Sequence, residues 1–163
     1  MQTWRPPQKI HAKVVGLAWH QDRLLAAEVT RDDGTVKGIR PPGGTIEFGE
    51  TREEALAREF QEEFGCGIAI EGSWATFENL FWHEGARGHE FIFAANIRLL
   101  DESLYQRSEI TLVEHDRSVW TARWFIPDAL PNGWELYPTG LAAHIKARYK
   151  LNRRAACRAF PST

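Results

Sequence analysis

Short apolar runs separated by polar turns fill the first forty residues of the chain, and this pattern is typical of β-strands. Residues 12–19 and 23–31 are rich in Val, Leu and Ala, and the polar residues 20–22 between them fit a tight hairpin. Residues 36–40 predict a further short strand, which ends at the Pro-Pro-Gly-Gly run of residues 41–44. Because prolines lack an N–H donor and glycines relax the backbone, we expect this run to be an irregular loop.

The clearest helix is predicted for residues 51–64. Thr51 and Glu54 match a capping box, in which each side chain accepts a hydrogen bond from the backbone N–H of the other residue. Glycines at positions 65 and 67 follow as stop signals. An apolar stripe recurs every four residues and consists of Leu56, Phe60 and Phe64.

The second half of the chain returns to strand patterns. Residues 68–81 and 89–99 predict two strands around a turn, and the second alternates, with an apolar face formed by Phe91, Phe93, Ala95 and Ile97. We expect residues 101–116 to be a long loop, residues 120–126 a strand and residues 140–156 a terminal helix. These elements predict an α+β fold in which a mixed β-sheet is sandwiched between helices, an α/β/α arrangement.

Length and composition restrict the class of protein. A chain of 163 residues suits one domain, so we expect residues 1–163 to form a single domain. The formal net charge of -2 gives no general attraction to nucleic acid, and no apolar run approaches the roughly 20 residues that cross a membrane. Neither Cys66 nor Cys157 lies at a spacing that is typical of zinc sites. We expect both to be unpaired thiols in a reducing compartment. We therefore expect a cytoplasmic protein without a membrane or nucleic-acid partner.

Three glutamates on the predicted helix are the first candidates for chemistry. At 100° per residue, Glu59, Glu62 and Glu63 fall within an arc of about 100° on one helix face. Like charges at these spacings repel one another by a few tenths of a kcal/mol per pair. A divalent cation removes this penalty, and carboxylate oxygens suit Mg²⁺ or Mn²⁺. The alternative is the solvated face of an ordinary Glu-rich helix.

The loop before the helix favours the metal-binding interpretation. Gly43 and Gly44 let the backbone come close to a ligand, and a Gly-rich loop with free N–H groups suits phosphate oxygens. Arg40 directly precedes the loop and is a candidate phosphate contact. Carboxylates beside a phosphate-tolerant loop indicate chemistry on a phosphate-containing substrate.

At this point the chain resembles a known family. Residues 44–50 read GTIEFGE and residues 58–66 read REFQEEFGC, which is similar to the Nudix box, G-x5-E-x7-R-E-U-x-E-E-x-G-U, where U is a bulky aliphatic residue. Every charged and glycine position is met, whereas Phe60 and Cys66 depart from the pattern at two packing positions. The strand order and residues 88–93 also resemble bacterial Nudix proteins grouped with ADP-ribose and nucleoside triphosphate pyrophosphatases.

The resemblance implies roles for particular residues. In the Nudix fold, Glu59, Glu62 and Glu63 would coordinate Mg²⁺, with the Gly43 carbonyl as a further ligand and Mn²⁺ as a substitute. Arg58 would pair with Glu50 and hold the carboxylates in place.

The general base varies within the family. The candidates are Glu62 or Glu63, followed by Glu90, Glu109 or Glu114. The residues expected at the substrate are Arg40, Gly44 and Glu90.

The resemblance also implies the reaction. We expect a Mg²⁺-dependent hydrolase that cleaves the diphosphate linkage of a nucleoside diphosphate derivative, such as ADP-ribose or a sugar nucleotide, by attack of an activated water at phosphorus. The alternatives are a nucleoside triphosphate pyrophosphohydrolase and a non-catalytic nucleotide-sensing module. The expected partner is a small nucleotide-type molecule, and a homodimer is possible. An isomerase of isoprenoid diphosphates would need a catalytic cysteine, for which Cys66 is poorly placed.

Overall fold

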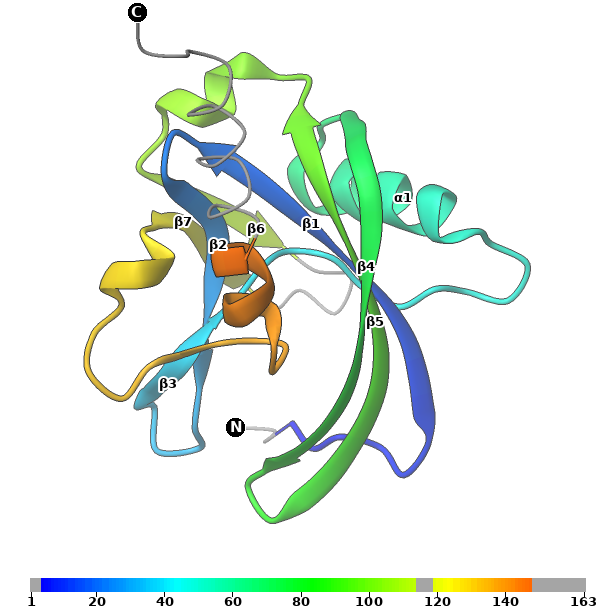
Figure 1. Cartoon of the computed structure of the whole chain (residues 1–163), viewed down its shortest axis with the longest axis vertical. Coiled ribbons are helices and arrows are strands. Elements are labelled where there is room, and N and C mark those ends of the chain that lie inside the picture. The colour runs from blue at the N-terminus through cyan, green and yellow to red at the C-terminus, as the bar shows by residue number, and fades with distance from the viewer. Residues whose placement is uncertain (1–3, 114–118, 148–163) are drawn as a thin grey trace, which may run out of the picture.

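The computed structural model describes residues 4–113 and 119–147 of the chain. Within them, eight strands form a mixed sheet with two halves that meet at β1 (Ile10–His20), as Figure 1 shows. In one half, β5 (Ala86–Leu99) lies parallel to β1 and antiparallel to β4 (Ile68–His83). This half is the long curved ribbon of Figure 1, and it carries most of the sheet contacts of β1.

The other half of the sheet is built around β2 (Arg23–Thr30). β2 lies between β3 (Val36–Arg40) and β7 (Val119–Phe125) and is antiparallel to both. β6 (Glu109–Val113) pairs with β7, and β8 (Glu135–Leu136) runs parallel to β3. Since β1 pairs with β2 only at its last two residues, the loop after β3 can lie beside the middle of β1.

Helix α1 (Arg52–Phe64) begins and ends where the sequence predicts. The Thr51 side chain accepts a hydrogen bond from the Glu54 N–H, and the Glu54 side chain accepts one from the Thr51 N–H, which confirms the capping box. Gly65 closes the helix in the left-handed conformation at φ 60°, and its N–H bonds to the Gln61 carbonyl. Helix α1 is therefore fixed at both ends by its own local sequence.

Both faces of the sheet are covered, which confirms the α+β class with the sheet between helices. Helix α1 buries Ala55, Leu56 and Phe60 against one face, and residues 141–147 form a helix that buries Leu141 and Ile145 against the other. Side chains of β1 alternate between these two cores: Val14 and Ala18 on the α1 side, Val15 and Leu17 on the other.

The prediction of a long loop for residues 101–116 is wrong. This stretch contains a 3₁₀ helix, η1 (Glu102–Gln106), and strand β6, and its last three residues, 114–116, lie outside the described residues. Ile110 and Leu112 of β6 are buried, because β6 pairs with β7 further along the chain. A five-residue alternation is too short to be recognised without its pairing partner.

The single apolar face predicted for residues 89–99 is also incomplete. Ile92 and Ala94 point to the opposite face and are buried as well, because the helix of residues 141–147 and the β2 half cover that side. The predicted terminal helix of residues 140–156 is helical over 141–147, and its remainder lies outside the described residues. In the described part of the chain, no helix is long and apolar enough to cross a membrane.

Candidate active site

The Pro-Pro-Gly-Gly loop is bonded to β1 along its length. The Gly16 N–H donates to the Pro42 carbonyl and the Val14 N–H donates to the Gly44 carbonyl, each at 2.9 Å. The carbonyls on either side of Gly43 therefore face β1, so the Gly43 carbonyl itself points away from that strand. The Gly43 oxygen is therefore not used in pairing the loop with β1.

Both glycines of the loop are required by close contacts. A Cβ atom at residue 43, which has φ 146°, would overlap the Val14 carbonyl oxygen. A Cβ atom at residue 44 would overlap the carboxylate of Glu59. The lack of a side chain at Gly44 thus allows the Glu59 carboxylate of α1 to lie directly against the loop.

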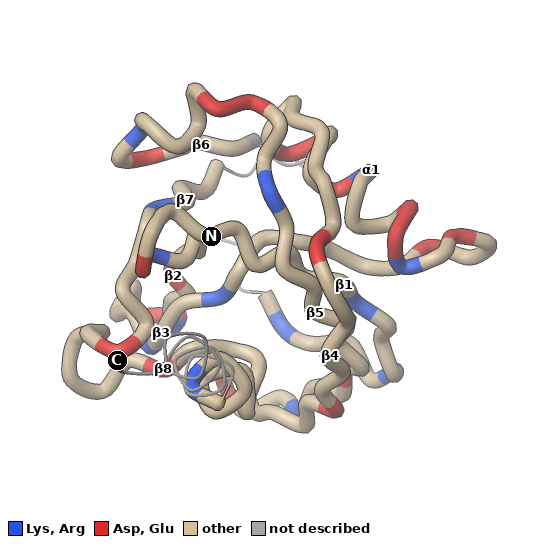
Figure 2. The backbone as a smooth tube through the Cα atoms, turned by 45° about the horizontal axis from the view of Figure 1, so that its top comes forward, with Lys and Arg blue, Asp and Glu red and all other residues tan. Residues whose placement is uncertain are grey.

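Arg58 is the centre of a charged cluster on α1. Its Nε and Nη2 donate to the two carboxylate oxygens of Glu50 at 2.6 and 3.0 Å, and its Nη1 donates to Glu59 at 3.1 Å and Glu62 at 3.2 Å. Nη2 also donates to the Thr45 carbonyl at 3.0 Å. The predicted Arg58–Glu50 pair is present, and one arginine bonds three carboxylates of the box. Figure 2 shows the acidic residues gathered along α1 and the loop before it.

Hydrogen bonds within this cluster change the charges of its members. The Arg58 guanidinium, and then the Glu47 backbone N–H, lower the pKa of Glu50 from 4.5 to about 2. The pKa of Arg58 is raised, first of all by its hydrogen bonds to Glu50. Glu50 is therefore ionised at neutral pH but is a weak proton acceptor, which suits a residue that positions Arg58 rather than a general base.

Glu62 and Glu63 differ in their surroundings. The Glu62 side chain is exposed at the helix surface, whereas Glu63 is half-buried and its Oε2 is shielded from solvent. Glu59 is also partly buried, with 15% of its side chain exposed. The three carboxylates thus differ in exposure, and all three offer hard oxygen donors.

These donors fit a divalent cation. Carboxylates and a backbone carbonyl are the ligand types that Mg²⁺ prefers, and Gly44 leaves room for Glu59 next to the Gly43 backbone. In the present arrangement Glu59 and Glu62 bond to Arg58, and among the described residues no three His, Cys, Asp or Glu side chains are close enough to hold a metal ion. The predicted ligand set therefore requires these carboxylates to turn from Arg58 toward the loop.

A second polar group lies on the other side of Gly43, in a small cavity of about 50 Å³. The cavity brings together Arg40, Gly43 and Glu90, three residues that the sequence places at a metal or substrate. Glu90 bonds to Lys13 of β1, with 3.0 Å between Oε1 and Nζ, and both side chains are largely buried. Arg40 is exposed at the end of β3, at the rim of the cavity.

Asn79 of β4 is a further residue of this cavity, and the sequence analysis missed it. It lies directly opposite Glu90 in the β4–β5 register and donates from Nδ2 to Glu90 Oε2 at 3.2 Å. Only 5% of Asn79 is exposed. In the sequence, Asn79 is a polar residue inside a predicted strand with apolar neighbours. This pattern does not reveal the role of Asn79, because that role depends on which residue of β5 lies opposite.

The two remaining candidates for the general base are Glu109 and Glu114. Glu109 of β6 accepts a hydrogen bond from Arg123 at 2.7 Å, and Arg123 also donates to Glu28 at 2.9 Å. This cluster is built from β2, β6 and β7, away from the loop that carries Gly43 and Gly44. Glu114 lies outside the described residues.

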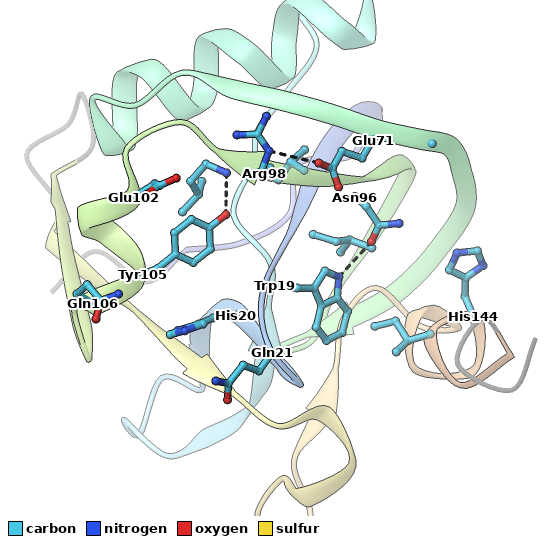
Figure 3. Close-up of a pocket in the computed structure, with 15 residues that line it drawn as sticks. Trp19, His20, Gln21, Glu71, Asn96, Arg98, Glu102, Tyr105, Gln106 and His144 are labelled. Carbon is cyan, nitrogen blue, oxygen red and sulfur yellow. Dashed lines mark hydrogen bonds and ion pairs between the residues drawn. The ribbon is translucent and has the colours of Figure 1, made fainter. Parts of the chain in front are cut away.

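A larger cavity of about 720 Å³ lies at the end of β1, and Figure 3 shows the residues that line it. Its polar groups bond to one another: Trp19 Nε1 donates to Asn96 at 3.1 Å, and Arg98 pairs with Glu71 at 3.5 Å. The Tyr105 hydroxyl accepts from the Leu99 N–H at 2.9 Å. Its described lining contains none of the box residues, so we place the chemistry at the loop and α1 instead.

Comparison with known proteins identifies the family and the fold. The NUDIX domain family matches residues 9–143 of the chain. The E. coli ORF135 protein, solved in solution, is 20% identical and superposes with a TM-score of 0.53, covering 85% of this chain and 90% of that one. A MutT NUDIX hydrolase from Burkholderia pseudomallei is 22% identical with a TM-score of 0.52, covering 83% of this chain and 96% of that one. No curated protein matches the chain.

The family match covers most of the chain, so the chain belongs to the Nudix family and its α+β sandwich is the Nudix fold. The protein is accordingly a pyrophosphohydrolase, and members of this family generally use a divalent metal and act on small nucleotide-type substrates. The solved structures are too distant in sequence to show more than the fold. The single-domain organisation, the cytoplasmic location and the homodimer stay predictions.

Proposed function

We propose that the protein hydrolyses the diphosphate linkage of a nucleoside diphosphate derivative, such as ADP-ribose or a sugar nucleotide, with Mg²⁺ as its cofactor. The observation that carries this proposal is the Arg58 cluster. One guanidinium bonds Glu50, Glu59 and Glu62 beside a loop in which a side chain at Gly44 would overlap the Glu59 carboxylate. Three acidic side chains held beside a Gly-rich loop suit a site that binds a cation together with phosphate oxygens.

The residues divide into ligands and positioning residues. Glu59, Glu62, Glu63 and the Gly43 carbonyl would hold Mg²⁺, for which Mn²⁺ would be a substitute. When bound, the ion neutralises charge on the diphosphate and makes an attacking water more acidic. Arg58 and Glu50 fix the helix carboxylates relative to the loop, because Glu50 takes two of the guanidinium hydrogen bonds.

Proton transfer falls to a carboxylate near the loop. The base takes a proton from the water that attacks phosphorus, and the bond from phosphorus to the bridging oxygen breaks. Glu62 or Glu63 is the first candidate, because Glu50 is a weak proton acceptor. Glu90 is the next, because it lines the cavity that contains Gly43.

Substrate contacts are proposed for the loop and its neighbours. The exposed guanidinium of Arg40, at the rim of the small cavity, suits the negative charge of the diphosphate. Gly44 lets phosphate oxygens approach the backbone, and Glu90 lies inside the cavity.

The test is to replace Glu62→Gln and Glu63→Gln together and to measure phosphate release. The panel contains ADP-ribose, sugar nucleotides, dinucleoside polyphosphates and normal and oxidised nucleoside triphosphates, each with Mg²⁺ and with Mn²⁺. We expect the double variant to lose about 100-fold or more of the wild-type rate on the preferred substrate. Preference for triphosphates would favour the alternative pyrophosphohydrolase, and nucleotide binding without turnover would favour a sensing module.

Glu53→Gln is the matched control for this test. Glu53 lies on the same helix, is exposed, and pairs with Arg52 at 3.0 Å outside the Arg58 cluster. Its rate should match that of the wild type within about twofold, because the substitution leaves every proposed ligand in place. Equal rates for the wild type and the Glu62/Glu63 variant would refute the proposed function.

A further inference from the structure

Asn79 lines the small cavity and carries a buried hydrogen-bond acceptor without a partner in the described part of the chain. The side chain is 95% buried, and its Oδ1 has no hydrogen-bond partner among the described residues. A buried amide oxygen without a partner is costly, so such groups usually meet a water or a ligand. The position of Asn79 in the lining of the cavity that also contains Gly43 points to a ligand of the same site.

The orientation of this amide is fixed by its neighbours. Glu90 accepts from Lys13 at Oε1 and from Asn79 Nδ2 at Oε2. A flip of the amide would place Asn79 Oδ1 against a carboxylate oxygen, which accepts hydrogen bonds and cannot donate one when ionised. The other carboxylate oxygen of Glu90 is already occupied by Lys13, with 3.0 Å between Nζ and Oε1. Asn79 Nδ2 is therefore held toward Glu90, and Oδ1 is left as the acceptor of the amide that is unpaired among the described residues.

The walls of the cavity suit a flat group. Val15, Ile92 and Pro138 supply apolar surface, and Tyr137 supplies an aromatic ring. At about 50 Å³ the space admits the edge of a ring or a single substituent, not a whole base. A sugar would bring several hydroxyls that each need a partner, whereas a base edge can satisfy Asn79 with one N–H.

We propose that Asn79 Oδ1 accepts a hydrogen bond from the exocyclic amino group of the substrate's base, so that the enzyme selects adenine or cytosine over hypoxanthine or uracil. The inference rests on the proposed function, because it places the base of the hydrolysed nucleotide in this cavity. Hypoxanthine and uracil carry a carbonyl oxygen where adenine and cytosine carry the amino group. That oxygen would face Asn79 Oδ1, acceptor against acceptor, and both would lose their partners.

The first experiment measures selectivity by kcat/KM on matched pairs: ADP-ribose against its hypoxanthine analogue, and CTP against UTP. We expect the wild type to prefer the amino member by roughly tenfold or more in whichever pair it hydrolyses. Asn79→Leu, similar in shape, should bring the ratio close to one. Glu90→Gln should also reduce it, because a neutral partner lets the Asn79 amide flip.

Asn96→Leu is the matched control. Asn96 lies on β5 and on the same sheet face, but its Oδ1 accepts from Trp19 in the larger cavity. Its selectivity ratio should equal that of the wild type. The wild-type ratio is informative even if Asn79→Leu folds poorly, since a ratio near one in the wild type overturns the inference by itself.

The second experiment measures nucleotide binding in the absence of metal and without hydrolysis. Calorimetry in excess EDTA compares AMP with IMP and CMP with UMP. Tighter binding of the amino member, lost in Asn79→Leu, supports the subsite even if no substrate is hydrolysed, which would refute only the proposed function. Conversely, hydrolysis with equal rates and equal binding within each pair overturns the Asn79 inference and leaves the proposed function standing, with a water as the partner of Oδ1.

Discussion

The two polar groups on either side of Gly43 are built in opposite ways. The Arg58 cluster comes from one continuous stretch of loop and helix, and its side chains range from 15% exposed at Glu59 to 37% exposed at Glu62. The cavity group of Lys13, Asn79 and Glu90 comes from three strands that are far apart in sequence, and it is largely buried. Local sequence positions the first group, whereas sheet pairing positions the second.

This difference indicates that the two groups have different roles in the site. Carboxylates that share one arginine can exchange this partner for a cation at modest cost at the exposed end of the cluster, where water screens their repulsion. Buried groups that satisfy one another are rigid, and a polar atom left over among them selects strongly for its complement. We therefore assign the chemistry to the helix and the recognition to the cavity.

Among the variants that test this division of roles, Gly44→Ala should have the largest effect, a loss of activity. A Cβ at this position overlaps the Glu59 carboxylate, so this side chain must swing away from the loop. A displacement of about 1 Å in a catalytic group can cost on the order of 100-fold in rate, which is the loss we expect in kcat/KM.

Gly67→Ala is the control for this substitution, because a Cβ there meets only the Leu100 side chain at 3.1 Å. Its activity should stay close to that of the wild type. If both alanine variants lost activity equally, the close approach of Glu59 to the loop would have no special role.

An intermediate effect is expected when the buried pair is broken by Lys13→Met. Glu90 would then keep only the Asn79 hydrogen bond in a setting where 12% of its side chain is exposed. We expect the free energy of unfolding to fall by about 1–3 kcal/mol in urea titrations at pH 7. Arg98→Met breaks an exposed pair with Glu71 and should cost less than about 1 kcal/mol. Equal losses of unfolding free energy in the two variants would contradict the expected difference between a buried and an exposed ion pair.

The smallest expected effect is a pH dependence of the free energy of unfolding that comes from Glu50. Because Arg58 lowers the pKa of Glu50 from 4.5 to about 2, ionised Glu50 contributes stability above pH 4.5, and this contribution is lost as the pH falls toward 2. The difference in free energy of unfolding between the wild type and Glu50→Gln should therefore shrink between these pH values. Urea titrations at pH 6, 4 and 2.5 measure it, and a difference that stays constant would contradict the Glu50–Arg58 assignment.

Much of the fold could be predicted from sequence where signals are local. The ends of α1 follow from Thr51, Glu54 and Gly65, and the bounds of β3 agree with the predicted residues 36–40. Strand β6 could not be predicted, because its five residues become a strand only through pairing with β7. The Arg58–Glu50 pair was predicted from the resemblance to the Nudix box and is present.

The sequence by itself determined the family, the helix with its caps, and the set of charged residues around Arg58, because helix geometry and short covalent separation place these groups together. Only the tertiary structure decided that Asn79 lies opposite Glu90, that Lys13 pairs with that carboxylate, and that all three border Gly43. The physical reason is strand register: a shift by one residue would turn Asn79 to the other face of the sheet, and no local pattern specifies which pairing is formed.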